Sequence, residues 1–272
     1  MSEAERPPHA VLARSPERFS PAAVAAVLAR RTGALAFDVL PVVRRSWGVV
    51  VESGPAEEGE ALAAELTAAG QPALAAPTSL LENPAEPAIP TKLALSNEGL
   101  EVLAWHGALP PERLPWARLS ALCAAGLETR SRTTVASGGP GELAAKAVRL
   151  GITLATGIPM GSGAPRKERV VESRDRALVL DLLFLEPSRS LRIEAARFDY
   201  GVLGARMAYS AELNFLELLA ELGTRAPRAL RGKGTRAILG KRPAAESAYE
   251  SLEDLRREER WLLTLSALRA AL

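Results

Sequence analysis

The chain has 272 residues, of which 47% are hydrophobic, and its formal net charge at pH 7 is only +2. This length suffices for two modest domains, and the small net charge argues against a chain that binds nucleic acid over its whole surface. The single cysteine, Cys123, excludes an internal disulfide and fits a reducing compartment. No stretch approaches the ~20 uncharged residues of a transmembrane segment. The charged N-terminus has no signal-peptide core, so we expect a cytoplasmic protein.

The first 85 residues alternate between strand and helix patterns. Ser20 followed by proline predicts a helix that ends at Gly33, and an acidic first turn predicts a second helix that ends at Gly70. Short apolar runs predict four strands, over residues 9–14, 34–43, 47–52 and 71–77. The resulting order is that of a ferredoxin-like βαββαβ sandwich, which we expect over residues 1–85.

A proline-rich linker separates this region from a second pattern, expected over residues 91–240. Two hairpins (91–105 and 177–195) and one further strand (114–126) precede an amphipathic helix that begins after Ser210 and ends at Gly223. Five strands followed by a covering helix resemble the architecture of a pleckstrin-homology-like (PH-like) barrel or a small curved antiparallel sheet. The predicted fold class is therefore α+β, with a C-terminal helical tail.

Residues 128–176 form a connection too long to be an ordinary loop, so we expect it to be functional or mobile, with a short helix over 141–157. Its carboxylates are the basis for the least favoured functional hypothesis, a hydrolase-type enzyme with a site under this segment. The candidate acids and bases are Glu168, Glu172 and Asp175.

No other catalytic or cofactor set can be assembled from the sequence. Two histidines and one cysteine are too few for a zinc or iron site, and no nucleophile-elbow motif accompanies His9 or His106. The glycine clusters at 138–141 and 157–163 lack the lysine and hydroxyl spacing of a phosphate-binding loop. We therefore expect no metal and no cofactor.

The most specific charge feature is a basic run over residues 225–242, which contains seven cations and no acid. It predicts an anionic partner, which is a nucleic-acid backbone, phospholipid headgroups or an acidic protein face, or alternatively a solvated loop and strand edge. No aromatic residue is interleaved with the cations, which disfavours base stacking. The candidate anion-binding residues are Arg228, Arg231, Lys233 and Arg236.

The C-terminal segment, 243–272, is predicted to be an amphipathic helix. One apolar face carries Trp261, Leu265, Leu268 and Leu272. This face either packs back on the rest of the chain or is offered to a partner or a second copy. The leading hypothesis is a non-catalytic interaction or regulatory protein that binds another protein or itself, and the alternative is the anionic binder described above.

Overall fold

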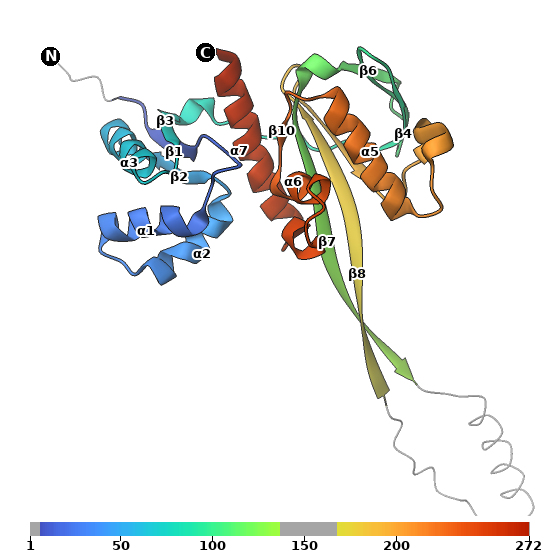
Figure 1. Ribbon diagram of the computed structural model, residues 1–272, viewed down its shortest axis with the longest axis horizontal. Coiled ribbons are helices and arrows are strands. Elements are labelled where there is room, and N and C mark those ends of the chain that lie inside the picture. Colours follow the sequence, from blue (N-terminus) through green and yellow to red (C-terminus); the bar gives the residue numbers. More distant parts are fainter. Residues whose placement is uncertain (1–5, 137–167, 272) are drawn as a thin grey trace, which may run out of the picture. The chain divides into compact units, whose positions relative to one another are not determined.

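The computed structural model describes residues 6–136 and 168–271 and has a mixed α+β fold (Figure 1). Its contacts divide the chain into two units, Met1–Leu127 with Ala177–Leu272, and Glu128–Arg176. All described elements belong to the first unit, except the ends of β7 and β8, which lie in the second.

The N-terminal region is a small antiparallel sheet covered on one face by helices. Strands β1 (His9–Ala13), β2 (Val49–Gly54) and β3 (Ala73–Pro77) pair in the order β2-β1-β3. Helices α1 (Pro21–Thr32), α2 (Ala36–Ser46) and α3 (Ala56–Ala68) cover it.

The strand predicted over 34–43 is wrong, because these residues form α2 and the region therefore lacks the βαββαβ order. Ala36, Val39, Leu40 and Val43 repeat at the spacing of a helix face, and Val43 is the residue of α2 that is fully buried. Pro41 lies inside this helix.

A second antiparallel sheet follows the short helix η1 (Thr78–Leu80). It consists of β4 (Pro90–Leu95), β5 (Gly99–Trp105) and β6 (Glu112–Pro115), so the predicted hairpin over 91–105 is confirmed. A single turn, η2 (Trp116–Arg118), then leads into the main sheet.

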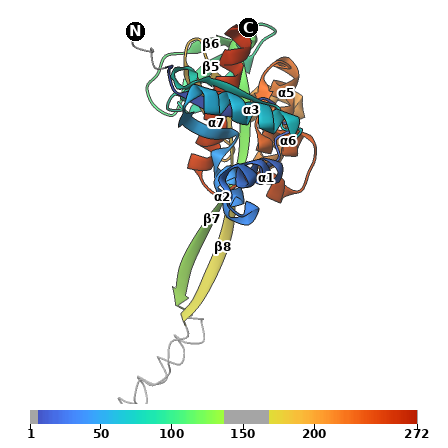
Figure 2. The ribbon, with the colours of Figure 1, turned by 90° about the vertical axis from the view of Figure 1, so that its left-hand side faces the viewer.

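The main sheet is built on two long neighbouring strands, β7 (Leu119–Ala136) and β8 (Glu168–Phe184), which run side by side (Figures 1 and 2). β9 (Arg189–Glu194) pairs antiparallel with β8, as predicted. Two short strands, β10 (Leu230–Arg231) and β11 (Ala248–Tyr249), pair with β7 in parallel. Residues 128–136 and 168–176 are thus strand rather than the expected loop, and the helix expected over 141–157 lies outside the described residues.

The remaining elements are helical. η3 (Tyr200–Arg206) precedes α5 (Ala211–Arg225), whose N-cap Ser210 was predicted. The helix continues past the predicted stop at Gly223, which is buried inside it. The basic run contains α6 (Lys233–Leu239), and η4 (Ala244–Ser247) and β11 lead to the final helix, α7 (Leu252–Ala271).

Helix α7 lies between the N-terminal sheet and the main sheet of the first unit. One apolar core joins it to the N-terminal sheet on one side and to β7 and β8 on the other (Figure 1). Side chains of β8 alternate, so Val179 and Leu183 face α7, whereas Leu180 and Leu182 face a second core that includes α5 and β5.

Hydrogen bonds with α7 hold the proline-rich linker, residues 77–90. The N–H of Glu82 donates to Thr264 Oγ1 over 2.9 Å, and Arg256 donates to the carbonyl of Ala85 over 3.0 Å. The boundary near residues 85–91 and the PH-like assignment stay predictions, whereas the element order β1-α1-α2-β2-α3-β3 differs from the predicted ferredoxin-like one. Within residues 6–136 and 168–271, no helix is long and apolar enough to cross a membrane.

Candidate functional site

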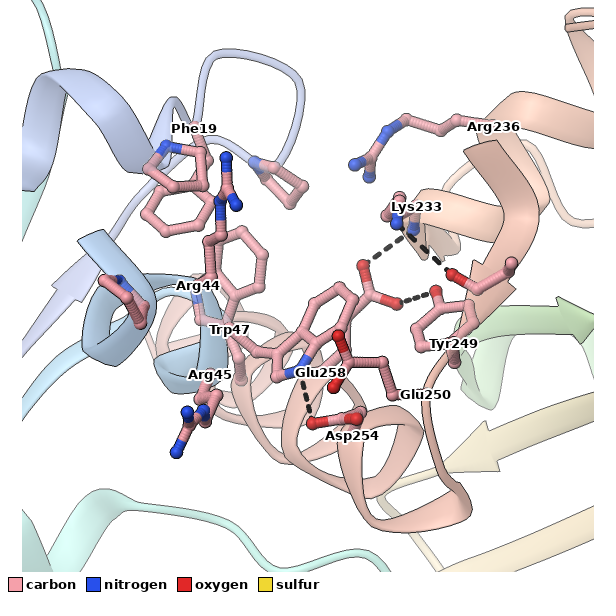
Figure 3. A pocket seen from close by; sticks show the side chains of 15 residues that line it. Phe19, Arg44, Arg45, Trp47, Lys233, Arg236, Tyr249, Glu250, Asp254 and Glu258 are labelled. Atoms are coloured by element: carbon pink, nitrogen blue, oxygen red, sulfur yellow. Dashed lines mark hydrogen bonds between the residues drawn. The ribbon is translucent and has the colours of Figure 1, made fainter. Parts of the chain in front are cut away.

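A cavity of about 520 Å³ lies between the N-terminal helices and the C-terminal elements of the first unit (Figure 3). Phe19 and Arg44 lie on one wall, Lys233 and Arg236 lie on the facing wall, and Trp47 lies between them. The full lining consists of Pro16, Phe19, Pro21, Pro41, Arg44, Arg45, Trp47, Lys233, Arg236, Ala248, Tyr249, Glu250, Asp254, Glu258 and Trp261. Ligand pockets are typically ~300–1,000 Å³ and mostly apolar, so the size and the aromatic lining suit a small ligand or part of a larger one.

The aromatic side of the cavity depends on the end of α2. Trp47 caps the helix in the left-handed conformation, with φ of 49°. Its indole stacks on Tyr249 with centroids 5.0 Å apart and donates to Asp254 over 3.4 Å. Phe19 packs on Trp261 with centroids 5.4 Å apart, and Trp261 donates to the carbonyl of Ala13 over 2.8 Å. Four rings from distant parts of the sequence thus form a fixed apolar wall.

The facing wall is the start of α6, which is docked on β7. The N–H of Gly232 donates to Leu122, and the Thr235 hydroxyl donates to the same carbonyl while it accepts from the N–H of Ala124. A side chain at Gly234 would come within 2.0 Å of the Ala124 carbonyl oxygen, so only glycine permits this close approach. These contacts hold the backbone from which Lys233 and Arg236 project.

The first turn of α6 is already occupied by a carboxylate of the protein. Glu258, which is buried, accepts the N–H of Lys233 over 2.6 Å and the hydroxyl of Tyr249. Burial raises the pKa of Glu258, and burial together with the Glu258 carboxyl raises the pKa of Tyr249. Because both oxygens of Glu258 accept hydrogen bonds, this carboxyl fixes α6 and is not free to act as an acid or base on a ligand.

The cations of the cavity form no direct ion pair with a described side chain, although the charges of Lys233 and Arg236 lie close enough to Glu258 to lower its pKa against the effect of burial. Arg44 and Arg45 are exposed and make no ion pair with the side chains that the structure describes, those of residues 6–127 and 177–270. Lys233 lies over the rings of Trp47 and Tyr249, at 5.6 and 5.5 Å from their centroids, and donates to a carbonyl. Arg236 donates to the carbonyl of Arg231.

The cavity is lined by three acidic residues, fewer than its four cations, and two of the three acids are hydrogen-bonded within the protein. Asp254 accepts from Trp47 and Ser251, and Glu258 is bonded as described, which leaves Glu250 as an exposed carboxylate without an ion pair in the described part of the chain. Four unpaired cations thus face one unpaired acid around an aromatic wall. The arrangement is suited to an anion attached to an apolar or planar body.

The structure brings two of the four predicted anion-binding residues to this cavity. Lys233 and Arg236 line it, whereas Arg228 is exposed elsewhere in the basic run and Arg231 donates to the carbonyl of Gly223 over 3.1 Å. Further cations of the run are engaged within the protein, because Arg225 pairs with Glu221 and Arg242 pairs with Glu246. The run therefore forms α6 and the edge strand β10, so the strand edge of the alternative interpretation is present, whereas residues 233–239 are helix and not loop.

The predicted partner-binding stripe lies mostly inside the protein. Trp261 is 1% exposed and Leu265 is 2% exposed, both in the core shared with the two sheets, and Leu268 is half-buried against that core. Leu272 lies outside the described residues. The prediction of an apolar face that is free to bind a partner is therefore wrong for Trp261 and Leu265. The helix packs back on the rest of the chain, which was the second possibility that the sequence left open.

A second polar cluster is buried between α7 and the main sheet. Asp181 forms a bidentate pair with Arg192, at 2.8 and 2.5 Å, and Glu259 lies beside Asp181, to which its protonated carboxyl donates a hydrogen bond, while neither of its oxygens accepts one from a described residue. Burial and the Asp181 carboxylate raise the pKa of Glu259 to about 10. Burial likewise raises the pKa of the Cys123 thiol, which is an inert core residue.

The hydrolase-type hypothesis gains no residues from the structure. The side chains of Glu168, Glu172 and Asp175 are not among the described ones. In the part of the chain that is described, no group of three or more histidine, cysteine or acidic side chains could hold a metal ion.

Sequence reasoning missed Arg44, Trp47 and Tyr249. Trp47 was assigned to the start of a strand, although a tryptophan before a glycine at the end of an apolar helical pattern is a possible helix C-terminus. No local pattern links residue 47 to residue 249, because only the packing of α7 brings them together.

The comparisons with known proteins add no relative. The chain matches no protein-family model, and no curated protein or solved structure is detectably similar to it. Its function therefore has to be argued from the site itself.

Proposed function

We propose that this chain is a non-catalytic interaction protein that recognises an anionic group of its partner in the aromatic cavity. The main observation behind the proposal is that the cations of the cavity form no ion pairs with described side chains, whereas most of its acids are hydrogen-bonded within the protein. Arg44, Arg45, Lys233 and Arg236 surround the cavity without an ion pair to any described carboxylate, and two of its three acids are held by internal hydrogen bonds. Unpaired cations beside a desolvated aromatic wall form stronger contacts with an anion than exposed cations do.

The non-catalytic part of the proposal rests on how the titratable groups of the cavity are used. Glu258 and Tyr249 bond to each other and to the start of α6, and Asp254 holds the indole of Trp47. Groups that already hold the fold in this way are poorly placed to exchange protons with a ligand.

The alternative, binding of nucleic acid or phospholipid along residues 225–242, has weaker support. Arg225, Arg231 and Arg242 are engaged in contacts within the chain. Arg228 and Lys241 are the exposed cations of the run whose side chains form no hydrogen bond or ion pair with a described residue. Two such residues are a small footprint for binding to a phosphate backbone.

Titration calorimetry with three small probes tests the proposal. Benzoate should bind more tightly than inorganic phosphate, because it offers an apolar ring as well as a charge, and neutral benzyl alcohol should bind least. Changing Arg44→Gln together with Lys233→Met should weaken benzoate binding by about tenfold or more, since two charge contacts are lost. Recovery of unchanged benzoate after incubation would agree with a non-catalytic role.

Arg228→Gln is the matched control, because it removes an exposed cation of the basic run outside the cavity. It should leave benzoate binding unchanged. Equal weakening by Arg228→Gln and by the cavity variant would move the anion site to the basic run, and absence of binding by either anion at millimolar concentration would refute the proposal.

A further inference from the structure

We infer that the group recognised in the cavity belongs to an acidic stretch of a protein chain, with an apolar side chain about three residues away from its acidic residues. This inference rests on the proposed function and specifies its partner. It comes from a surface that continues out of the cavity along α2.

The first turn of α2 exposes two large apolar side chains. Leu35 is 72% exposed and Phe37 is 83% exposed. Single exposed apolar residues are common on protein surfaces. Leu35 is the N-cap of α2 and Phe37 lies in its first turn, and the later residues Pro41 and Arg44 of the same helix line the cavity.

Helix geometry places this apolar group in line with the cavity. Phe37, Pro41 and Arg44 are spaced i, i+4 and i+7, which puts them on one face of α2. Seven residues of helix span about 10 Å, which is the length of about three residues of an extended chain. A ligand that places its acid near Arg44 therefore needs an apolar side chain about three residues away to contact Phe37.

The charges around this face favour an acidic partner. Arg44 and Arg45 are exposed and make no ion pair with the described side chains of residues 6–127 and 177–270. Asp38 is the one acid of α2. A positive, partly apolar surface of this kind complements a segment that combines glutamate or aspartate with an apolar residue.

The concave site favours a peptide over a lipid surface. Lys233 and Arg236 line the inside of a cavity of about 520 Å³, so a ligand has to enter it to reach them. A peptide can place one end in the cavity and lie along α2, whereas a flat bilayer surface would meet only the exposed face of the helix.

Fluorescence anisotropy with designed peptides and the full chain tests the inference. Two test peptides each carry three consecutive glutamates and one phenylalanine three positions away from them. The phenylalanine is on the N-terminal side of the glutamates in one peptide and on the C-terminal side in the other. Control peptides replace the phenylalanine by glycine or place it next to the glutamates. One of the two test peptides should bind about tenfold more tightly than its glycine control.

The variant Phe37→Ser should abolish the advantage of the phenylalanine peptide and leave benzoate binding in the cavity unchanged. Val42→Ser is the matched control, because Val42 is 67% exposed on another side of the same helix, and it should have no effect. Benzoate binding without any preference for the phenylalanine peptide would refute this inference alone, whereas failure of benzoate and all peptides would refute the proposed function as well.

Two further results would overturn the inference in favour of another occupant. One is Phe37-dependent sedimentation with phosphatidylcholine vesicles that contain phosphatidylserine, without peptide binding. The other is a Phe37-dependent dimer in light scattering, which would identify a second copy of this chain as the occupant.

Discussion

At the scale of single residues, the contact between Gly48 and Trp261 fixes the aromatic wall of the cavity. Gly48 has φ of 89°, and a Cβ placed there would lie 2.3 Å from the Trp261 indole. Trp261 cannot move aside easily, because it is buried and bonded to Ala13. The glycine is therefore required by its backbone conformation and by the close approach of a rigid ring.

We predict that Gly48→Ala lowers the free energy of unfolding by about 3 kcal/mol or more, from backbone strain together with overpacking. Gly33→Ala is the matched control, because Gly33 also has positive φ, 71°, but has no atom within 4 Å of the added Cβ. It should cost only about 1 kcal/mol. Urea denaturation of both variants measures the difference, and equal losses would show that the Trp261 contact is not tight.

The buried carboxyl of Glu259 makes a second prediction, on pH dependence. Its pKa is raised in the folded chain by burial and by Asp181, so the folded state holds a proton that the unfolded state releases above about pH 4.5. Stability from this group is fully present at low pH and is lost as the pH rises toward 10. Glu259→Gln, which stays neutral, should match the wild type near pH 4 and exceed its stability by about 2–3 kcal/mol at pH 7.

Denaturation at several pH values between 4 and 9 measures this effect. The control Glu60→Gln changes an exposed carboxyl of α3 and should show no growing difference. A Glu259→Gln protein that is less stable than wild type at every pH would mean that Glu259 is ionised in the fold.

At the scale of elements, local sequence patterns predicted those segments whose apolar spacing is unambiguous. The two hairpins were found, because alternating apolar residues flank short turns in 91–105 and 177–195. The N-caps Ser20 and Ser210 were also found, and both side chains accept the expected backbone N–H.

The elements that were missed are those whose local signals conflict. The segment Ala36–Ser46 contains valines and a proline, which favour strand or loop, yet its apolar residues repeat at helical spacing and α2 packs against α1 and α7. In the basic run, α6 is only seven residues long, and it is held by the contacts of Thr235 and Glu258 with distant elements. Tertiary contacts decide both helices, so a local pattern was insufficient.

The difference between local patterns and tertiary contacts also explains which residues of the cavity could be predicted from the sequence. Lys233 and Arg236 were candidates, because a dense charge run is visible in the sequence. The residues that face them come from the end of α2 and from β11, and no local spacing indicates that these segments meet. These segments meet only because α7 packs against both the N-terminal sheet and the main sheet of the first unit.

At the scale of the whole first unit, α7 is the element on which both the N-terminal sheet and the main sheet depend. Its residues Leu255, Trp261 and Leu262 are buried in one core with side chains of the N-terminal sheet and of β7 and β8. Glu258 holds the start of α6, and Thr264 and Arg256 hold the linker. Removal of this helix would expose one face of each sheet to water, which no other described element covers.

We therefore predict that a chain ending at Arg242 fails to fold cooperatively and does not behave as an intact protein that has lost only a binding tail. Circular dichroism during urea denaturation should show a broad, low-amplitude change in place of a single transition, and hydrogen exchange should show β1 unprotected. The control chain begins at Pro7, loses only the N-terminal end and should unfold like wild type. A cooperative transition of normal midpoint in the chain ending at Arg242 would show that α7 is dispensable for the fold, and the cavity residues of α7 would then have to be assigned to binding alone.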